Sequence, residues 1–339
     1  MGGEHRLMED WVRVHETHIG AVFLIGDSAY KLKKPVDFGF LDFTSRHERE
    51  AVCHKEVALN RRLAPDVYFG VADVTGPDGR VCDHLVVMRR MPEERRLSTL
   101  VSRGEPLTQV IEDLAQLIAH FHERAERGPE VSAQGSRDAI RDRWRASFAQ
   151  VRPFHGTVLD KAAAIEIEHL TEEFLTGRAP LFDRRIATGH IVDGHGDLLA
   201  DDIFCLDDGP RVLDCLEFDD RLRNLDGLDD VAFLAMDLER LGAPELAKEL
   251  LDRYIALSGD PAPPALRHHY LAYRAFVRVK VACLRHDQGD ESAAPLARTC
   301  AELALRHLRE GVVRLVLVGG LPASGKSTLA GGIADHLGG

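Results

Sequence analysis

Three aspartates in one short segment have the residue types that phosphoryl transfer requires. Asp197 stands in a His-Gly-Asp sequence, Asp202 comes five residues later, and Asp214 ends the next apolar run. Transfer of a phosphoryl group to a hydroxyl needs a carboxylate that orients the nucleophile and accepts its proton. It also needs oxygen ligands for the Mg²⁺ that bridges the phosphates. The three carboxylates satisfy both needs, so the segment predicts phosphotransfer chemistry with a magnesium site.

Two lysines and one glutamate nearer the N-terminus fit the other half of such a site. A nucleotide-dependent phosphotransferase needs a strand lysine to hold the α- and β-phosphates and a helix glutamate to position that lysine. Lys31 and Lys33 lie two residues apart on one face of a predicted strand, and Glu56 lies on the following predicted helix. Lys31 is the first candidate and Lys33 the alternative, because a strand register slips easily by two residues. We expect Lys31 and Glu56 to approach within ~4 Å.

The elements that must position these side chains fall into two groups. Turn residues and β-branched runs predict a strand-rich first third with one helix, whereas the apolar period becomes helical after about residue 105. A strand-rich island over 194–218 interrupts the helices and contains the three aspartates. The order predicts an α+β, two-lobed, protein-kinase-like fold. The predicted strands are 12–14, 21–25, 29–33, 68–74, 81–91, 203–206 and 211–213, and the predicted helices are 45–63, 137–150, 160–176, 228–241, 244–257 and 264–286, with a further apolar helical stripe over 110–121.

A complete P-loop motif lies near the C-terminus. The sequence from Gly320 to Thr328 matches Gly-x-x-x-x-Gly-Lys-[Ser/Thr], after a predicted buried strand over 314–318 and before a predicted helix. Backbone N–H groups between Gly320 and Gly325 would cradle phosphates, Lys326 would reach the β- and γ-phosphates, and Ser327 would bind Mg²⁺. Eleven residues follow Thr328, too few for the sheet and acidic strand of an α/β P-loop domain. We expect a truncated domain over 311–339, after lobes over 1–92 and 93–310.

Composition narrows the class of protein. The net charge is -12, which argues against nucleic acid as a partner because phosphate neutralisation needs a basic surface. No apolar run approaches the ~20 residues that cross a bilayer, and the polar N-terminus has no apolar signal core, so we expect a cytoplasmic protein without a membrane partner. The six cysteines lie far apart without a Cys-x-x-Cys pair, which argues against a cysteine zinc site or a disulfide framework.

The segment around Asp197 resembles the aminoglycoside phosphotransferase and choline kinase superfamily, whose motif is His-Gly-Asp-x-x-x-x-Asn followed by Ile-Asp. The resemblance implies that Asp197 is the catalytic base, with His195 shaping the loop, and that Asp214 is the principal metal ligand. Asp202 occupies the position of the second metal ligand. It departs from the family, where Asn is usual, so we expect a ligand of altered affinity.

Further segments narrow the resemblance. Residues 30–36, 40–43, 59–65 and 273–280 are similar to a bacterial group in which a kinase-like domain precedes a P-loop kinase domain, and this similarity covers essentially the whole chain. It implies ATP and Mg²⁺ as cofactors and places Met88 in the hinge against adenine. The bacterial group itself implies no particular acceptor; the leading hypothesis for a phosphotransferase of this kind is transfer to the hydroxyl of a small molecule such as a sugar, an amino sugar or an aminoglycoside.

Two other carboxylates and one loop complete the predicted site. Glu217 is a candidate for a further site carboxylate, and we expect Asp230 to cap a helix that brackets the catalytic loop. Residues 16–20 stand where a nucleotide-covering loop belongs, but they contain one glycine only. That loop and the Asp202 change favour the alternative of a non-catalytic ATP-binding module that regulates the P-loop domain. The intact Asp197 opposes it.

Overall fold

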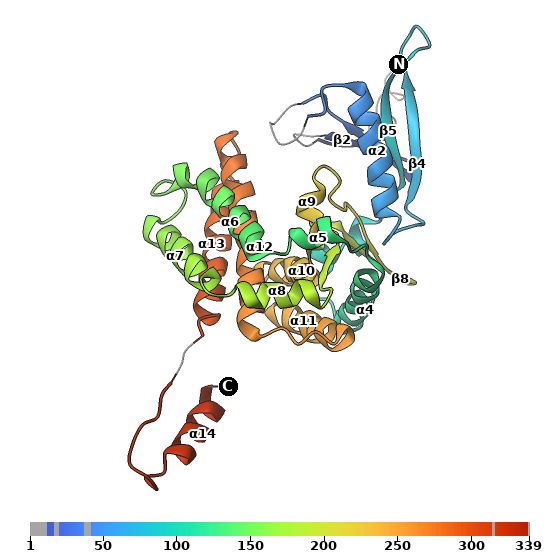
Figure 1. Ribbon diagram of the computed structural model, residues 1–339. Coiled ribbons are helices and arrows are strands. Elements are labelled where there is room, and N and C mark those ends of the chain that lie inside the picture. Colours follow the sequence, from blue (N-terminus) through green and yellow to red (C-terminus); the bar gives the residue numbers. More distant parts are fainter. Residues whose placement is uncertain (1–11, 17–19, 37–41, 314–315, 338–339) are drawn as a thin grey trace.

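The first lobe of the protein is an antiparallel sheet with one helix packed on it. The structure, a computed structural model, describes residues 12–16, 20–36, 42–313 and 316–337. In the first lobe the five strands run in the order β1-β2-β3-β5-β4, and the helix α2 lies against β4 and β5 (Figure 1). The elements are β1 Val12–Glu16, β2 Gly20–Ile25, β3 Ser28–Lys33, α2 Arg46–Asn60, β4 Tyr68–Thr75 and β5 Val81–Arg89.

Local sequence explains the first lobe. Gly26, with φ 57°, makes the two-residue turn between β2 and β3, since a tight hairpin turn needs a left-handed residue. Helix α2 begins after Ser45, whose side chain accepts a hydrogen bond of 3.1 Å from the backbone N–H of Glu48, the arrangement expected of an N-cap. Its buried face carries Cys53, Glu56 and Val57, which places Glu56 against the sheet.

The second lobe is helical, with two small sheets in which β6 pairs with β9 and β7 with β8. The predicted α+β, two-lobed architecture is confirmed. Sequence analysis missed α13, although its buried alanines and leucines recur at helical spacing. The small alanine side chains let α13 pack closely on α12. The elements are α3 Leu97–Ser102, α4 Thr108–Arg124, α5 Pro129–Ala133, α6 Arg137–Val151, α7 Lys161–Leu175, α8 Ala179–Ala187, β6 Ile191–Asp193, β7 Ile203–Leu206, β8 Gly209–Val212, α9 Asp220–Arg223, β9 Asn224–Asp226, α10 Gly227–Arg240, α11 Pro244–Ser258, α12 Pro264–Asp287 and α13 Ala293–Glu310, with 3₁₀ turns at Glu93–Arg95, Arg152–Phe154 and Ala200–Asp202.

The core of the second lobe surrounds α10, whose residues 227–238 are all buried. Aromatic rings join α6 to α12: Trp144 lies 5.2 Å from Tyr273 and 5.4 Å from Phe276, measured between ring centroids. These contacts fix α12 beside residues 194–218, which carry Asp197, Asp202 and Asp214 and are called the catalytic segment below. No helix of the described residues is both long enough and apolar enough to span a bilayer.

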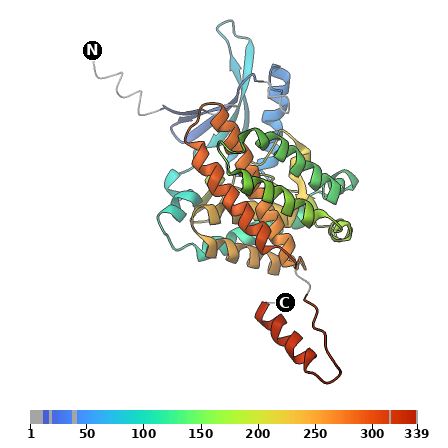
Figure 2. The same cartoon turned by 90° about the vertical axis from the view of Figure 1, so that its left-hand side faces the viewer.

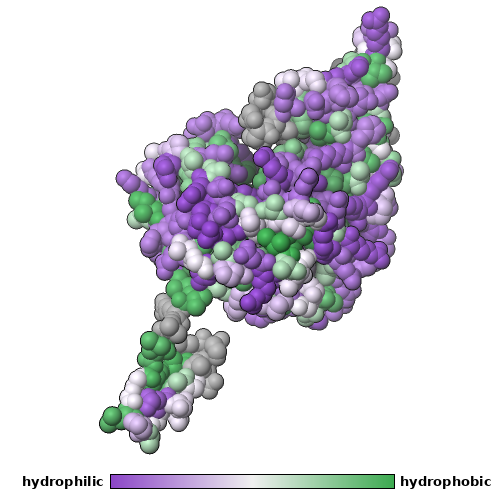
Figure 3. Space-filling model, in the orientation of Figure 1, coloured by the Kyte–Doolittle hydropathy of each residue, from purple (hydrophilic) through white to green (hydrophobic). Residues whose placement is uncertain are grey.

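The C-terminal segment lies apart from both lobes (Figures 1 and 2). The predicted strand over 314–318 is wrong for its described part, because residues 316–318 form no strand and Leu317 is 83% exposed. An apolar run becomes a strand only when neighbouring strands accept its hydrogen bonds, and none of the described strands pairs with it. The predicted helix does follow, as α14 Lys326–Leu337. Figure 3 shows apolar side chains of this segment on the surface. Val316, Leu317 and Leu321 are among its exposed apolar residues.

A buried ion-pair network ties α8 to the start of α10. The Arg185 guanidinium donates two hydrogen bonds of 2.7 Å to Asp226 and one of 2.7 Å to Asp260, and all three side chains are at most 4% exposed. The hydroxyl of Tyr270 also donates to Asp226, at 3.0 Å. Burial of two carboxylates is tolerated here because one cation serves both.

Replacing Arg185 should therefore destabilise the second lobe strongly. Arg185→Ala leaves two buried carboxylates without their cation, and we expect a loss of about 3–5 kcal/mol in the free energy of unfolding. Denaturant titration followed by circular dichroism measures this loss. Arg184→Ala, one residue away on the exposed side of α8, is the matched control and should change stability by less than about 0.5 kcal/mol. Equal losses in the two variants would contradict the assigned role of the network.

Candidate active site

A cavity of about 340 Å³ opens between the two lobes, within the size range of small-molecule sites. Of the predicted site residues, Lys31, Met88, Asp202 and Asp214 line it. Lys33, Glu56, Asp197 and His195 do not line this cavity but are joined to it through the contacts described below. The apolar part of its wall comes from both lobes, with Val22, Leu24, Ala29 and Met88 on one side and Phe204 and Leu213 on the other.

Two lysines of β3 share one buried glutamate of α2. Lys31 Nζ lies 2.9 Å from Glu56 Oε1, and Lys33 Nζ lies 2.6 Å from Glu56 Oε2. The predicted approach of Lys31 to Glu56 is therefore present. Glu56 is fully buried, and the two ammonium groups lower its pKa although burial by itself would raise it. A carboxylate held between two cations stays ionised and fixes both lysine side chains.

Beyond Glu56, the two lysines have different partners. Lys31 Nζ lies 2.5 Å from Asp214 Oδ1 at the cavity, whereas Lys33, 1% exposed, bonds to Glu217 beneath it. Sequence reasoning considered one lysine or the other. In the structure Lys31 faces the cavity, and Lys33 links Glu56 to the buried Glu217.

Asp214 has a strained backbone. Its φ of 62° is left-handed, a conformation that costs energy in a residue with a Cβ and is common at functional sites. The backbone N–H of Asp214 donates to the buried hydroxyl of Tyr68, at 3.2 Å, which holds the turn in place. Burial opposes the charge of Asp214, but the Lys31 ammonium outweighs that effect and lowers its pKa.

The neighbouring carboxylates fit a divalent cation. Burial, and then the negative charges of Asp214 and Asp197, raise the pKa of Asp202 well above its ordinary value. Asp202 and Asp214 both line the cavity, and the repulsion between their negative charges is relieved when a cation lies between them. Hard oxygen donors of this kind suit Mg²⁺, so Asp202 and Asp214 are a chemically suitable donor pair for it.

His195 positions the catalytic loop from beneath. The imidazole is buried, its Nε2 lies 3.1 Å from the carbonyl oxygen of Leu213, and the backbone N–H of Asp197 donates to its Nδ1 at 3.3 Å. An Nε2–H tautomer satisfies both contacts. Burial lowers the pKa of His195 to about 4, so the ring is neutral at pH 7. We therefore describe His195 as a positioning residue.

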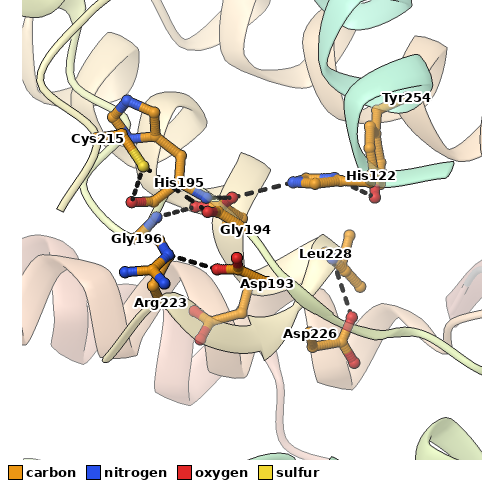
Figure 4. Close-up of polar contacts among 12 residues, drawn as sticks. His122, Asp193, Gly194, His195, Gly196, Cys215, Arg223, Asp226, Leu228 and Tyr254 are labelled. Atoms are coloured by element: carbon orange, nitrogen blue, oxygen red, sulfur yellow. Dashed lines mark hydrogen bonds and ion pairs between the residues drawn. The ribbon is translucent and has the colours of Figure 1, made fainter. Parts of the chain in front are cut away.

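Asp230 holds the same loop from the other side. Its Oδ2 accepts hydrogen bonds from the backbone N–H of His195, at 2.6 Å, and from His122 Nε2, at 3.0 Å, while Oδ1 accepts from the N–H of Gly196, at 2.9 Å. Tyr254 lies 2.9 Å from the other nitrogen of His122 (Figure 4). A Cβ on Gly194 would lie 2.5 Å from Asp230, so only glycine allows this approach.

The predicted cap at Asp230 is wrong, although the predicted bracketing of the loop is present. Asp226 caps α10, since its side chain accepts from the N–H of Leu228 at 2.9 Å. Asp230 lies one turn further along the helix and turns inward. Sequence reasoning also missed His122 and Tyr254, because residues on α4 and α11 give no local signal of a contact with residue 230.

Asp197 lies between α12 and the metal-ligand candidates. Burial raises its pKa to about 6, against the lowering effect of the Arg278 guanidinium, with Asp214 adding to the rise. From α12, Arg274 bonds to the carbonyl oxygen of Gly196 at 3.2 Å and to Asp229 at 2.7 Å. The carboxylate of this candidate base is thus ionised at neutral pH, and its pKa is close to the value that general-base catalysis favours.

Two residues at the C-terminal end of α2, Asn60 within the helix and Arg62 just after it, connect the lobes. Asn60 Oδ1 accepts from the backbone N–H of Cys215 at 2.9 Å, and Arg62 donates to the carbonyl oxygens of Asp193 and Gly194 at 3.1 and 3.0 Å. The helix that carries Glu56 is therefore bonded directly to the catalytic segment. Of the predicted covering loop over 16–20, residues 17–19 lie outside the described residues, while its two ends belong to β1 and β2.

The P-loop residues do not reach this cavity. Lys326 Nζ donates to the carbonyl oxygen of Leu321 within its own loop, at 2.5 Å, and Gly325, with φ 81°, precedes the first turn of α14. Gly320, Ser327 and Thr328 are exposed in the same segment.

Solved structures share this fold. A choline/ethanolamine kinase family protein from Mesorhizobium loti matches with a TM-score of 0.51 and 14% identity, over 88% of this chain and 92% of that one. Plasmodium vivax ethanolamine kinase gives 0.52 and 11%, over 89% and 83%. The GDP complex of aminoglycoside 2'-phosphotransferase-IIIa gives 0.50 and 15%, over 92% and 100%. The chain has the protein-kinase-like fold of these structures.

Two proteins are similar to this chain in sequence over nearly its whole length. Proteins described as uncharacterized from Mycobacterium tuberculosis (strain H37Rv) and Mycobacterium bovis are 46% identical over 330 residues, which is 97% of this chain. The chain spans 66% of the length of these relatives. No protein-family model matches the chain.

The neutral, buried state of His195 predicts an acid-sensitive contribution to stability. Because the pKa of His195 is about 4 in the folded protein against 6.5 for the free side chain, the unfolded chain binds the proton first as pH falls. This contribution is present above pH 6.5 and is lost as pH falls toward 4. Between pH 7.5 and 5, His195→Gln should lose about 2 kcal/mol less unfolding free energy than the unchanged protein.

Denaturant titrations at both pH values measure this difference. His169→Gln is the control, because the His169 side chain is 75% exposed and should leave the pH dependence unchanged. The assignment fails if His195→Gln loses as much stability on acidification as the unchanged protein does.

Proposed function

We propose that the protein is an ATP-dependent phosphotransferase that moves the γ-phosphate to a hydroxyl of a small molecule. The observation that carries the proposal is the bridge made by Lys31, which reaches Glu56 on one side and Asp214 on the other at the wall of the inter-lobe cavity. A cation fixed in this way is the group that holds the phosphates of a bound nucleotide. The names of the solved structures with this fold, choline/ethanolamine kinase and aminoglycoside phosphotransferase, favour a small-molecule acceptor.

In the proposed complex the adenine lies between the apolar walls of the cavity, beside Met88 in the hinge. Arg96 adds a planar guanidinium 4.7 Å from the centre of the Phe204 ring at the same wall. Lys31 holds the α- and β-phosphates, while Glu56 keeps its ammonium in place. Lys33 stays buried as the second cation that keeps Glu56 ionised.

At the reacting end, Asp197 orients the acceptor hydroxyl and accepts its proton, since burial leaves it a stronger base than an exposed aspartate but still ionised at pH 7. Asp214 and Asp202 hold Mg²⁺, which neutralises the charge of the transferring phosphoryl group when bound. The backbone bonds from His195 and Asp230 keep the carboxylate of Asp197 in its place during transfer. The acceptor in this proposal is a sugar, an amino sugar or an aminoglycoside.

The P-loop forms a separate part of the proposal. We assign lobes over 1–92 and 93–310 and the start of a P-loop domain over 311–339, in which Gly320, Gly325, Lys326, Ser327 and Thr328 contact a second nucleotide. The second candidate function, an ATP-binding module that regulates this domain without turnover, is favoured by Asp202 at the usual Asn position. ATP binding without phosphate transfer to any of a panel of sugars and aminoglycosides would support it over the enzyme.

Removing the proposed base tests the mechanism. Asp197→Ala should lower turnover by on the order of 10²–10⁴, because proton acceptance is lost, while ATP affinity stays within a few-fold. Turnover is measured by ADP release with the most active acceptor of the panel, and affinity by calorimetry. Asp201→Ala, an exposed neighbour in the same loop, is the control and should retain activity. Unchanged turnover in Asp197→Ala would exclude Asp197 from the mechanism.

Replacing Asp214 should weaken Mg²⁺-dependent ATP binding more than replacing Asp202 does. Asp214→Asn removes the carboxylate that faces Lys31 and should weaken Mg²⁺-dependent ATP binding at least ten-fold. Asp202→Asn installs the usual residue of related enzymes and should weaken it less. Titrations of ATP at several Mg²⁺ concentrations compare the variants. A larger defect in Asp202→Asn than in Asp214→Asn would reverse the assigned roles.

A further inference from the structure

A cluster of three donor atoms joins the first turns of α12 to the last turn of α13, remote from the proposed nucleotide site. His268 comes from α12, while His307 and Glu310 lie three residues apart on α13. The Nδ1 atoms of the two histidines are 3.1 Å apart, and Glu310 Oε2 lies 3.6 Å from each of them. One ligand atom from each side chain thus faces a common point.

The triangle has the size that a zinc ion requires. A point equidistant from three atoms with these separations lies about 2.0 Å from each, which matches Zn–N and Zn–O bond lengths of about 2.0–2.2 Å. In a tetrahedral zinc site, ligand atoms at such bond lengths lie about 3.3 Å apart, between the two separations observed here. Three protein donors leave a fourth position, which faces solvent beside the half-exposed Glu310 and suits a water molecule.

The surroundings of His307 resemble those of a ligating histidine. Its side chain is 4% exposed, and its second nitrogen, Nε2, lies 3.1 Å from Glu239 Oε2. Glu239 also bonds to Arg306, which keeps it in place. A carboxylate that accepts the Nε2–H proton fixes the tautomer in which Nδ1 is the free donor, as outer-sphere carboxylates do in zinc proteins.

Close packing brings the cluster together. A Cβ on Gly311, the residue directly after α13, would lie 3.1 Å from the Cβ of His268 and 3.2 Å from the carbonyl oxygen of His307. Glycine at this position therefore allows α12 and α13 to approach where the three donors meet. The widely spaced cysteines, which argued against a zinc site in the sequence, do not bear on a site made of histidine and glutamate.

We propose that His268, His307 and Glu310 bind a Zn²⁺ ion that cross-links α12 to the end of α13, with water as the fourth ligand. Imidazole nitrogen favours zinc over Mg²⁺, so this site and the carboxylates of Asp202 and Asp214 take different metals. The ion closes the second lobe at the point where the chain leaves it toward the P-loop segment. The proposal does not depend on the proposed phosphotransferase activity.

Metal content of the whole chain tests the site. Protein stripped with a chelator is dialysed against Zn²⁺ in buffer with millimolar Mg²⁺, which competes for the carboxylate site, and bound zinc is measured by mass spectrometry. We expect one zinc per chain, with at least ten-fold weaker binding in His268→Ala and in Glu310→Gln. His268 and Glu310 are 30% and 49% exposed, so both variants are chosen to preserve folding.

A control variant and a second measurement, the melting temperature, distinguish a specific zinc site from adventitious zinc binding. His169→Ala removes an exposed histidine that lies 3.8 Å from Glu173 without a third donor, and it should leave zinc binding unchanged. Zinc should raise the melting temperature of the unchanged protein and of His169→Ala but not of His268→Ala, because an ion that binds only the folded state stabilises it. Cobalt substitution should give the strong visible absorption of a tetrahedral site. Zinc binding that is absent, or equal in His268→Ala, Glu310→Gln and the unchanged protein, would show that the three side chains form hydrogen bonds only.

Discussion

The structure depends on a rule of electrostatics: a charge taken out of water must meet an opposite charge or several hydrogen-bond donors. Asp230 illustrates it. The carboxylate is fully buried, and it receives three hydrogen bonds, two from the backbone of the catalytic loop and one from His122. Its pKa lies well below the ordinary value because these donors and the nearby histidines outweigh burial, which alone would raise it. The loop cannot move without leaving that charge unsatisfied, so its conformation is fixed before any ligand arrives.

The same rule joins the two lobes. Glu56 needs both Lys31 and Lys33, and these lysines in turn reach Asp214 and Glu217 in the second lobe. The chain of alternating charges sets the position of the β3 strand relative to the catalytic segment. It also gives the two lysines of β3 different surroundings, since the deeper Lys33 pairs with Glu56 and Glu217 while Lys31 faces the cavity.

Electrostatic order and backbone geometry act together at the catalytic segment. Asp214 adopts a left-handed conformation that its surroundings enforce through Tyr68 and Lys31. Gly196, with φ 85°, has a backbone conformation that favours glycine, and a Cβ there would lie 3.3 Å from Arg223 and Leu216. Strain of this kind persists only where neighbouring contacts determine the structure more than once. Here the contacts come from β3 and β4 as well as from α2, α10 and α12, and they converge on a few residues.

The sequence alone determined the two-lobed α+β architecture, because the change from strand to helical periodicity is a local property of neighbouring residues. It also identified Asp197, Asp202 and Asp214 as a group, since the loop and hairpin that carry them are local. It placed Lys31 near Glu56 because a phosphotransfer site needs a strand lysine held by a helix glutamate, a requirement of the chemistry and not of the local sequence. Only the tertiary structure decided that Asp226 rather than Asp230 caps α10, and that His122 and Tyr254 support the catalytic loop.

The tertiary structure also decided that the apolar run at residues 316–318 forms no strand. It likewise brought His268 close to His307 and Glu310. An apolar run predicts a strand correctly only if partners lie beside it, and a metal site exists only where distant helices bring donors within reach. Both conditions depend on residues far apart in the chain. Local propensity and motif spacing contain no information on such distances, whereas the packing of α12 against α13 fixes them.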